Sequence, residues 1–156
     1  MAVFQKILCP VDFSKTSGHA FVYAAAIAQQ FEAELILLHV MEDVPLFTAY
    51  SGLPAMDVPP EVEKSARKDL ERLAASVGAG KAKVQTVIVR GKSHEAVLKY
   101  ATEHNVDLIV IGKHGRSQLD YWLFGSVTER VIRRAACPVV VVPGPAEAKE
   151  AHPARK

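Results

Sequence analysis

The residues best suited to do chemistry in this chain are the glycines of one connection between a strand and a helix. Gly112-Lys113-His114-Gly115 is followed, after nine residues, by Gly125-Ser126-Val127-Thr128. A strand-like apolar run, Val106–Ile111, precedes this pattern, and a helix-like run, Ser126–Ala135, ends it. Glycines let backbone N–H groups approach a ligand closely, and a helix N-terminus adds donors and a partial positive charge. The pattern therefore predicts a phosphate-binding connection of the kind that holds nucleotides.

The connection differs from the two commonest glycine-rich nucleotide motifs. No Gly-Lys-Ser/Thr triplet ends it, and no G-x-G-x-x-G occurs in the chain. Ser126 is expected to be the N-cap of the following helix, with Glu129 completing a capping box. In the plainer alternative, the glycines only turn the chain and Ser126 only caps. Three glycines, the hydroxyls of Ser126 and Thr128, and the cation Arg116 exceed what a turn needs, which favours binding.

The interval between the glycines contains an apolar cluster, made of Leu119, Tyr121, Trp122, Leu123 and Phe124. We expect these side chains to pack against neighbouring helices. The alternative is that they form part of a partner surface, where Trp and Tyr are common.

Short apolar runs alternate with helical stretches along the chain. The apolar runs are expected to be strands buried on both faces, over Lys6–Val11, Leu35–Val40, Lys83–Val89, Val106–Ile111 and Pro138–Val142. The helical stretches run from Thr16 or Ser17 to Phe31, and over Glu61–Ser76, Ser93–Glu103 and Ser126–Ala135. Segment 41–60, with its prolines and glycine, is expected to be a loop or lid. A single domain is expected over 1–143, with a disordered tail over 144–156.

Two of the helical stretches carry further local signals. In the stretch after the loop, Val62, Ala66, Leu70 and Leu73 share one apolar face, with charges elsewhere. In the next stretch, Ser93 is expected to cap the helix N-terminus.

Strands that alternate with helices predict an α/β fold, a five-stranded parallel sheet with helices on both faces. Right-handed crossovers leave few arrangements, and we expect the strand order 3-2-1-4-5. Ligands in such sheets bind at the carboxyl ends of the two strands that flank the reversal of the order. Those ends are Asp12 and Gly112, which are predicted to face one crevice although 100 positions separate them. Asp12 could alternatively serve only as the cap of the first helix.

Composition narrows the class of protein. Hydrophobic residues make up 49% and charged residues 23% of the chain, which is ordinary for a soluble globular protein. A formal charge of +2 without a Lys/Arg run gives no sign of nucleic-acid binding. No apolar run is long enough to span a membrane, and the first residues lack the features of a signal peptide. Cys9 and Cys137 are expected to be buried thiols, so we expect a cytoplasmic protein.

The histidines give weak signals. His39, at a strand end, is expected to pack rather than to catalyse. His114 is expected to face solvent, with phosphate contact as the minority interpretation. The remaining histidines show no spacing typical of metal ligands.

The glycine pattern resembles the G-x2-G-x9-G-[ST] signature of the universal stress protein family, in its ATP-binding branch. The similarity extends to Ile7–Ser14, Leu37–Val40, Gly125–Val131 and Cys137–Val142, and covers about residues 2–143. The resemblance implies a Rossmann-like fold of the adenine-nucleotide alpha-hydrolase type, and ATP as the ligand.

The resemblance also implies roles for individual residues. Asp12 would contact the nucleoside or a bound divalent ion such as Mg²⁺, and the Val40 backbone would read adenine beside Pro10 and Val11. The residues that would border the ribose and phosphates are Gly112, Gly115 and Arg116. Those that would hold the phosphates through backbone N–H and hydroxyl groups are Gly125, Ser126, Val127 and Thr128.

The last expected strand suggests a homodimer. In the order proposed it lies at the sheet edge, yet Val139–Val142 carries no charge or mid-strand proline, which usually blunt exposed edges. Pairing of Pro138–Val142 with its copy about a two-fold axis would cover the edge. The resemblance implies such a dimer too. Alternatively, the N-terminus or the tail covers this edge.

Three functions fit these residues. The first is an ATP-binding regulatory protein with little or no turnover, whose protein partner the sequence does not name. The second is a slow ATP hydrolase or phosphotransferase. Arg116 and Lys113 are the candidate charges for it, but no obvious base orients a water. The third is an interaction module that binds another adenine nucleotide or has a vestigial pocket. The complete glycine motif argues against a vestigial site.

Overall fold

The protein forms a three-layered α/β structure. The structure, a computed structural model, describes residues 3–42, 58–77, 82–115 and 123–145. Its strands are β1 (Lys6–Pro10), β2 (Glu34–Met41), β3 (Val84–Arg90), β4 (Leu108–Gly112) and β5 (Val139–Val142). Its helices are α1 (Lys15–Phe31), α3 (Pro60–Ala75), α4 (Ser93–Glu103) and α5 (Ser126–Arg134). Each lies within two residues of its expected range.

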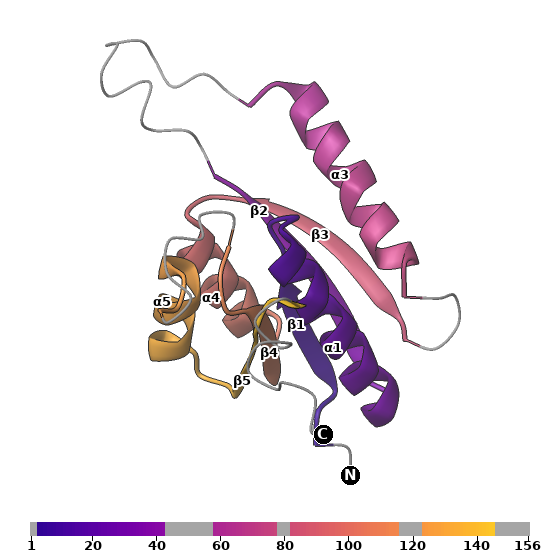
Figure 1. Cartoon of the computed structure of the whole chain (residues 1–156), viewed down its shortest axis with the longest axis vertical. Helices are drawn as coiled ribbons and strands as arrows, with labels where there is room; N and C mark the ends of the chain where they lie inside the picture. Colours follow the sequence, from indigo (N-terminus) through magenta and orange to yellow (C-terminus); the bar gives the residue numbers. More distant parts are fainter. Residues whose placement is uncertain (1–2, 43–57, 78–81, 116–122, 146–156) are drawn as a thin grey trace, which may run out of the picture.

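The strands form one parallel sheet in the order β3-β2-β1-β4-β5, as predicted (Figure 1). Central β1 pairs with β2 from Lys6 opposite Glu34 to Pro10 opposite Leu38. On its other side it pairs with β4, where Ile7 lies opposite Leu108. The order therefore reverses between β1 and β4.

Helices cover both faces of the sheet, so two separate apolar cores form. On one face, α1 and α3 pack over side chains that include Ile7, Leu35, Leu37 and Val110. On the other, α4 and α5 pack over side chains that include Leu8, Ile36, Leu38 and Ile109. The alternation of side chains along each strand sends neighbouring residues to opposite cores. This explains why the central strands are apolar throughout.

Helix α1 begins slightly earlier than expected because Ser14 is its N-cap. The Ser14 hydroxyl oxygen accepts a hydrogen bond from the backbone N–H of Ser17 at 3.1 Å. The helix ends where Glu32 adopts a left-handed conformation. Its inner face is mostly alanine, with Phe21 fully buried. Small side chains let α1 approach the sheet closely.

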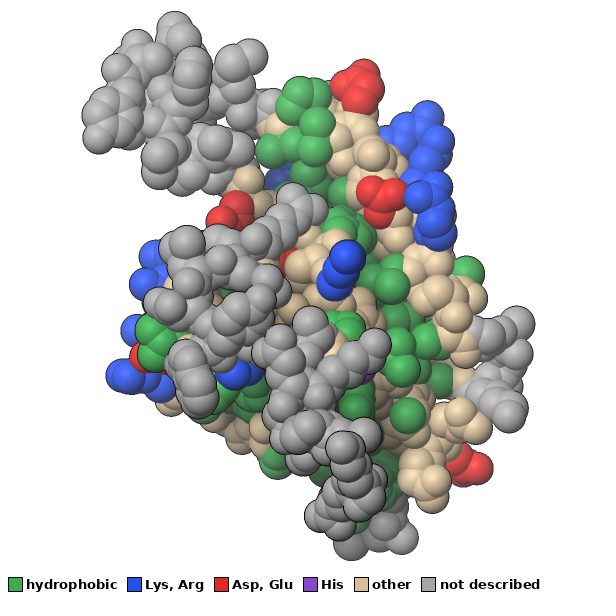
Figure 2. All heavy atoms as spheres, viewed as in Figure 1, with side chains coloured by type: hydrophobic (Ala, Val, Ile, Leu, Met, Phe, Trp, Pro, Cys, Tyr) green, Lys and Arg blue, Asp and Glu red, His purple; other side chains and the backbone are tan. Residues whose placement is uncertain are grey.

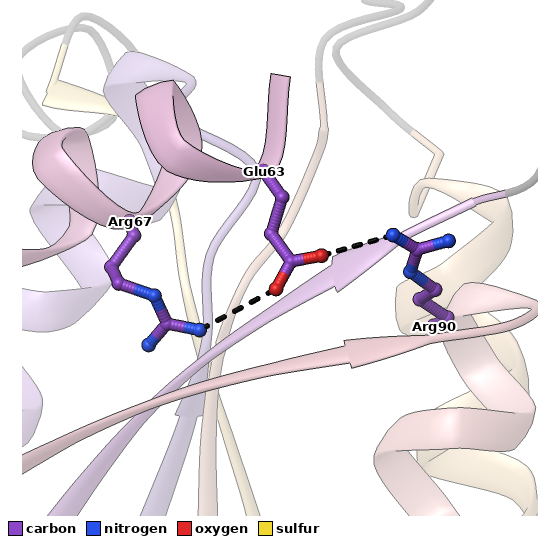
Figure 3. Close-up of polar contacts among 3 residues, drawn as sticks. All are labelled: Glu63, Arg67 and Arg90. Carbon is purple, nitrogen blue, oxygen red and sulfur yellow. Dashed lines mark hydrogen bonds and ion pairs between the residues drawn. The ribbon is translucent and has the colours of Figure 1, made fainter. Parts of the chain in front are cut away.

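Helix α3 is anchored to the core by only part of its apolar face. Leu70 is fully buried, whereas Val62 near the N-terminus is 49% exposed. The first half is held instead by Glu63, which bonds to Arg90 of β3 at 2.9 Å and pairs with Arg67 at 3.6 Å (Figure 3). In the space-filling view both charge signs are visible along α3 (Figure 2). This half of α3 is consequently available to form one wall of a cleft.

Helix α4 is capped differently from the expectation. Its N-cap is Lys92, and Ser93 is the first helical residue. The acceptor comes from the end of β2, because the Glu42 carboxylate takes the Ser93 N–H at 2.9 Å. The expected Ser93 cap was therefore wrong, since a distant carboxylate performs that task.

The two thiols lie in different environments. Cys9 is completely buried in the sheet, as expected, and burial raises the pKa of its thiol. Cys137 is only half-buried, although burial also raises its pKa. Among the residues described, no helix has the length and apolarity to span a membrane.

Candidate functional site

A cleft opens where the strand order reverses. Its floor is formed by the ends of β1, β2 and β4, and its walls by the first turns of α3, α4 and α5. Its volume of about 1380 Å³ exceeds the roughly 300–1,000 Å³ of typical ligand pockets. The cleft brings together nearly all of the predicted site residues, namely Pro10, Val11, Asp12, Val40, Gly112, Gly115, Gly125, Ser126, Val127 and Thr128.

The two halves of the glycine pattern lie against each other. The Gly125 N–H donates to the Lys113 carbonyl at 2.9 Å. The hydroxyl of Thr128, a residue only 3% exposed, donates to the Gly112 carbonyl at 2.7 Å. The interval of nine residues is thus closed at its base, and one compact surface results.

Two of the glycines are required by close approach. A Cβ on Gly112 would lie 2.9 Å from Thr16 Cγ2, and one on Gly115 would lie 2.8 Å from Asp12 Oδ2. Both distances are shorter than real Cβ contacts. Glycine therefore lets the connection after β4 lie directly against the turn after β1.

The N-terminus of α5 faces this surface. Its N-cap is Gly125, with no side-chain cap, and Ser126 is the first helical residue. The expected Ser126 cap and its capping box were wrong, because Ser126 lies inside the helix. Glu129 pairs instead with Arg133 at 2.9 Å. The N–H groups of the first helical residues have no acceptor within the helix. They are therefore suited to bind an anion.

Asp12 lies at the turn between β1 and α1. Its Oδ1 accepts the Ser14 N–H at 3.0 Å, and its own N–H donates to Ser17 Oγ at 3.3 Å. The N-cap of α1 is Ser14, so the alternative in which Asp12 serves only as the cap of this helix was wrong. In the part of the chain that the structure covers, no group of three His, Cys, Asp or Glu side chains could hold a metal ion alone.

The backbone of Val40 faces the space beyond the end of β1. Along β2, Leu38 bonds toward β1 by accepting the Val11 N–H, whereas Met41 bonds toward β3 by accepting the Gly91 N–H. Alternate residues of a parallel strand bond to opposite neighbours, so Val40 points toward β1. Since β1 ends at Pro10, the Val40 N–H and C=O have no backbone partner there among the described residues.

The histidines near the site are ordered by packing. His39 Nδ1 lies 2.9 Å from the Val11 carbonyl, and the ring packs on Phe13 at 4.6 Å between centroids. Phe13 adopts a left-handed conformation (φ 64°), which is unusual for a bulky residue. The expectation that His114 faces solvent was wrong, since this residue is only 6% exposed.

Sequence reasoning overlooked the wall that faces the strand ends. Glu42, Ser93 and His94 line the cleft where α4 begins, and Arg130 lines it on α5. The Ser93 hydrogen bonds lower the pKa of Glu42. His94 is buried, and burial followed by the charge of Arg130 lowers its pKa. A local signal existed for the position of Glu42, Ser93 and His94, since they follow the ends of β2 and β3 as Asp12 follows β1.

Some expectations fall beyond the described residues. Arg116, Leu119, Tyr121 and Trp122 lie there, as do most of segment 41–60 and tail residues 146–156. Leu123 and Phe124 are described and are exposed, in contrast to the packing expected for the apolar cluster.

The model of the universal stress protein family matches residues 4–143. The chain belongs to this family. It is 32% identical to universal stress protein MJ0577 of Methanocaldococcus jannaschii, over 90% of this chain and 95% of the relative. Its identity to universal stress protein YxiE of Bacillus subtilis is 31%, over 90% and 99% of the two chains.

Solved structures agree with the fold. That of MJ0577 matches with a TM-score of 0.78 and 33% identity, covering 90% of this chain and 96% of the other. A universal stress protein in complex with cAMP matches with a TM-score of 0.65 and 25% identity, covering 90% and 98%. An adenine nucleotide therefore binds to at least one protein of this fold and family.

Thr128→Val tests the closure of the glycine connection. The substitution keeps the side-chain shape but removes the donor, leaving the buried Gly112 carbonyl without its partner. We expect the free energy of unfolding, measured with urea, to fall by about 1–3 kcal/mol. Thr102→Val, which removes an exposed bond to Leu98 within α4, should change it by less than about 0.5 kcal/mol. Equal losses in both variants would contradict this role of Thr128.

Proposed function

We propose that this universal stress protein binds an adenine nucleotide, with ATP as the favoured ligand, and acts as a nucleotide-dependent regulator with little or no turnover. The observation that carries the proposal is the closed glycine connection beside the α5 N-terminus. It places Gly115 and the first-turn backbone N–H groups of Ser126, Val127 and Thr128 on one wall of the cleft. This is the arrangement that binds phosphates in many folds.

The remaining floor suits the nucleoside. The Val40 N–H and C=O offer one donor and one acceptor, which match the ring nitrogen and amino group of adenine. Pro10 and Val11 supply apolar surface beside them. Asp12 lies between this position and Gly115, where the sugar of a nucleotide would lie. The cAMP complex of a related protein supports an adenine nucleotide as the class of ligand.

A divalent ion fits the same arrangement. Mg²⁺ is usually held by one or two carboxylates together with phosphate oxygens. Asp12 provides one carboxylate close to the glycine connection, and the nucleotide would provide the other oxygens. We infer that Mg²⁺ binds with ATP rather than before it.

Identification of the bound molecule tests the function directly. We expect protein purified without added nucleotide, then denatured, to release ATP or ADP that mass spectrometry detects, or to bind added Mg-ATP in calorimetry. Turnover should stay at or below about 10⁻² s⁻¹, far under usual enzyme rates. Faster hydrolysis would favour the hydrolase instead. Protein that is empty and rejects ATP, ADP and cAMP would refute the proposal.

Glycine substitutions test the phosphate-binding connection. A side chain at Gly115 would displace the Asp12 carboxylate, and the larger valine side chain at Gly125 would press on the backbone of Lys113–Gly115. Gly115→Val and Gly125→Val should therefore weaken ATP binding at least tenfold in calorimetry. Gly18→Ala is the matched control, because nothing lies within 4 Å of the added methyl group. This variant should bind as the parent does and unfold with equal or slightly higher stability. Unchanged affinity in both valine variants would remove the assignment.

We further infer that the protein is a homodimer through β5. This strand forms the sheet edge, and Val140 is 37% exposed on it. Because Ile109 N–H bonds to Pro138 and Lys113 N–H to Val142, the backbone groups of Val139 and Val141 point away from β4. A two-fold copy of β5 would satisfy these groups and cover Val140.

Val140→Lys tests this dimer. A charge at the centre of the paired edge should convert the protein to a monomer, measured by sedimentation equilibrium. Val22→Lys, at an exposed valine on α1, should leave the dimer intact. A monomeric parent protein would contradict the inference.

A further inference from the structure

His94 is a buried imidazole on the cleft wall with no assigned role. It lies in the first turn of α4, is 4% exposed and lines the cleft. Its Nε2 lies 3.7 Å from Glu95 Oε1, beyond hydrogen-bond distance. All completely buried side-chain nitrogens and oxygens of the described residues have partners. The ring nitrogens of His94 must therefore be reached from the cleft.

The cleft lining near His94 includes apolar side chains beside the charged ones. Val97 follows one turn later on α4, and Leu38 and Ile111 come from the ends of β2 and β4. All three belong to the core that α4 and α5 cover. These apolar side chains line the same cleft as the His94 ring and Val40. They offer apolar surface of the kind that suits a flat base.

Burial and the surrounding charges favour the neutral form of His94. Arg130 and Arg134 approach from α5, and Lys92 and Glu95 flank it on α4. Burial is the main cause that lowers the pKa of His94, and the three cations lower it further. The Glu95 carboxylate raises the pKa but does not offset them. A neutral imidazole offers one donor and one acceptor.

A carboxylate already occupies the anion position at this helix end. Glu42, from the end of β2, accepts the Ser93 N–H and lies within the electrostatic reach of His94. A phosphate at the α4 N-terminus would be repelled by this carboxylate. The phosphates are therefore directed to α5, and His94 is left to the other end of the nucleotide.

We propose that His94 contacts the base of the bound nucleotide through its neutral imidazole and contributes to base selection. This inference rests on the proposed function, since it assumes that a nucleotide fills the cleft. Because only the neutral ring makes this contact, affinity is present above the pKa of the unliganded His94 and is lost as the pH falls through it. The loss approaches tenfold for each pH unit below that pKa.

His94→Phe and His94→Gln test the contact, with adenosine and ATP as separate probes in calorimetry between pH 5 and 8. His94→Phe should weaken adenosine and ATP by the same factor, about tenfold, as one lost hydrogen bond predicts. His94→Gln keeps a donor and an acceptor but does not titrate, so its affinity for adenosine should lose the acid dependence. His104→Gln is the control, because this ring lies at the other end of α4 and bonds to the Tyr100 carbonyl.

The outcomes separate the two proposals. If the parent protein binds both probes and His94→Phe binds as the parent does, only the His94 inference fails. If His94→Phe weakens ATP but not adenosine, the ring contacts phosphate and the inference is wrong. A parent protein that binds neither probe overturns both. In the parent protein, the NMR resonance of His94 Cε1–H must also shift when adenosine is added. This measurement does not depend on whether any variant folds.

Discussion

The hydrogen bond from the Thr128 hydroxyl to the Gly112 carbonyl is the contact on which the site depends. It joins the first turn of α5 to the last residue of β4, across the whole glycine connection. With the Gly125 bond to Lys113, it fixes where the α5 N-terminus lies. Each of these two bonds contributes about 1 kcal/mol to holding the ends of the connection together.

The closed glycine connection also has to fit against the turn that follows the neighbouring strand, β1. β1 and β4 lie side by side, and the chain leaves them toward opposite faces of the sheet, into α1 and α5. The turn after β1 can then lie against the glycines only if they have no side chains. Thr16 and Asp12 occupy the positions that Cβ atoms on Gly112 and Gly115 would need. The same absence of side chains that permits packing exposes the backbone donors.

The fold could be predicted because its signals are local and repeated. Buried strands such as Leu35–Val40 are apolar throughout, and the crossover rule then fixed the strand order. Residues that follow strand ends, such as Asp12 and Gly112, were found for the same reason. The acceptor at α4 was missed because Glu42 lies 51 positions from Ser93. No local pattern predicts a cap from another strand, and none predicted that His114 would be buried.

The helix N-termini around the cleft explain where an anion can bind. At α1 the Ser14 hydroxyl serves as the side-chain cap, and at α4 the Glu42 carboxylate does so. The first turn of α3 carries Glu61 and Glu63, which disfavour an anion there. Among the helices described, α5 combines a glycine N-cap without a side-chain cap and the cation Arg130 on the cleft wall, and the acidic residue of its first turn, Glu129, pairs with Arg133. The positive end of one helix dipole is thus left for a ligand, while the others are satisfied by the protein. This asymmetry orients a nucleotide, with its phosphates toward α5 and its base toward Val40 and His94.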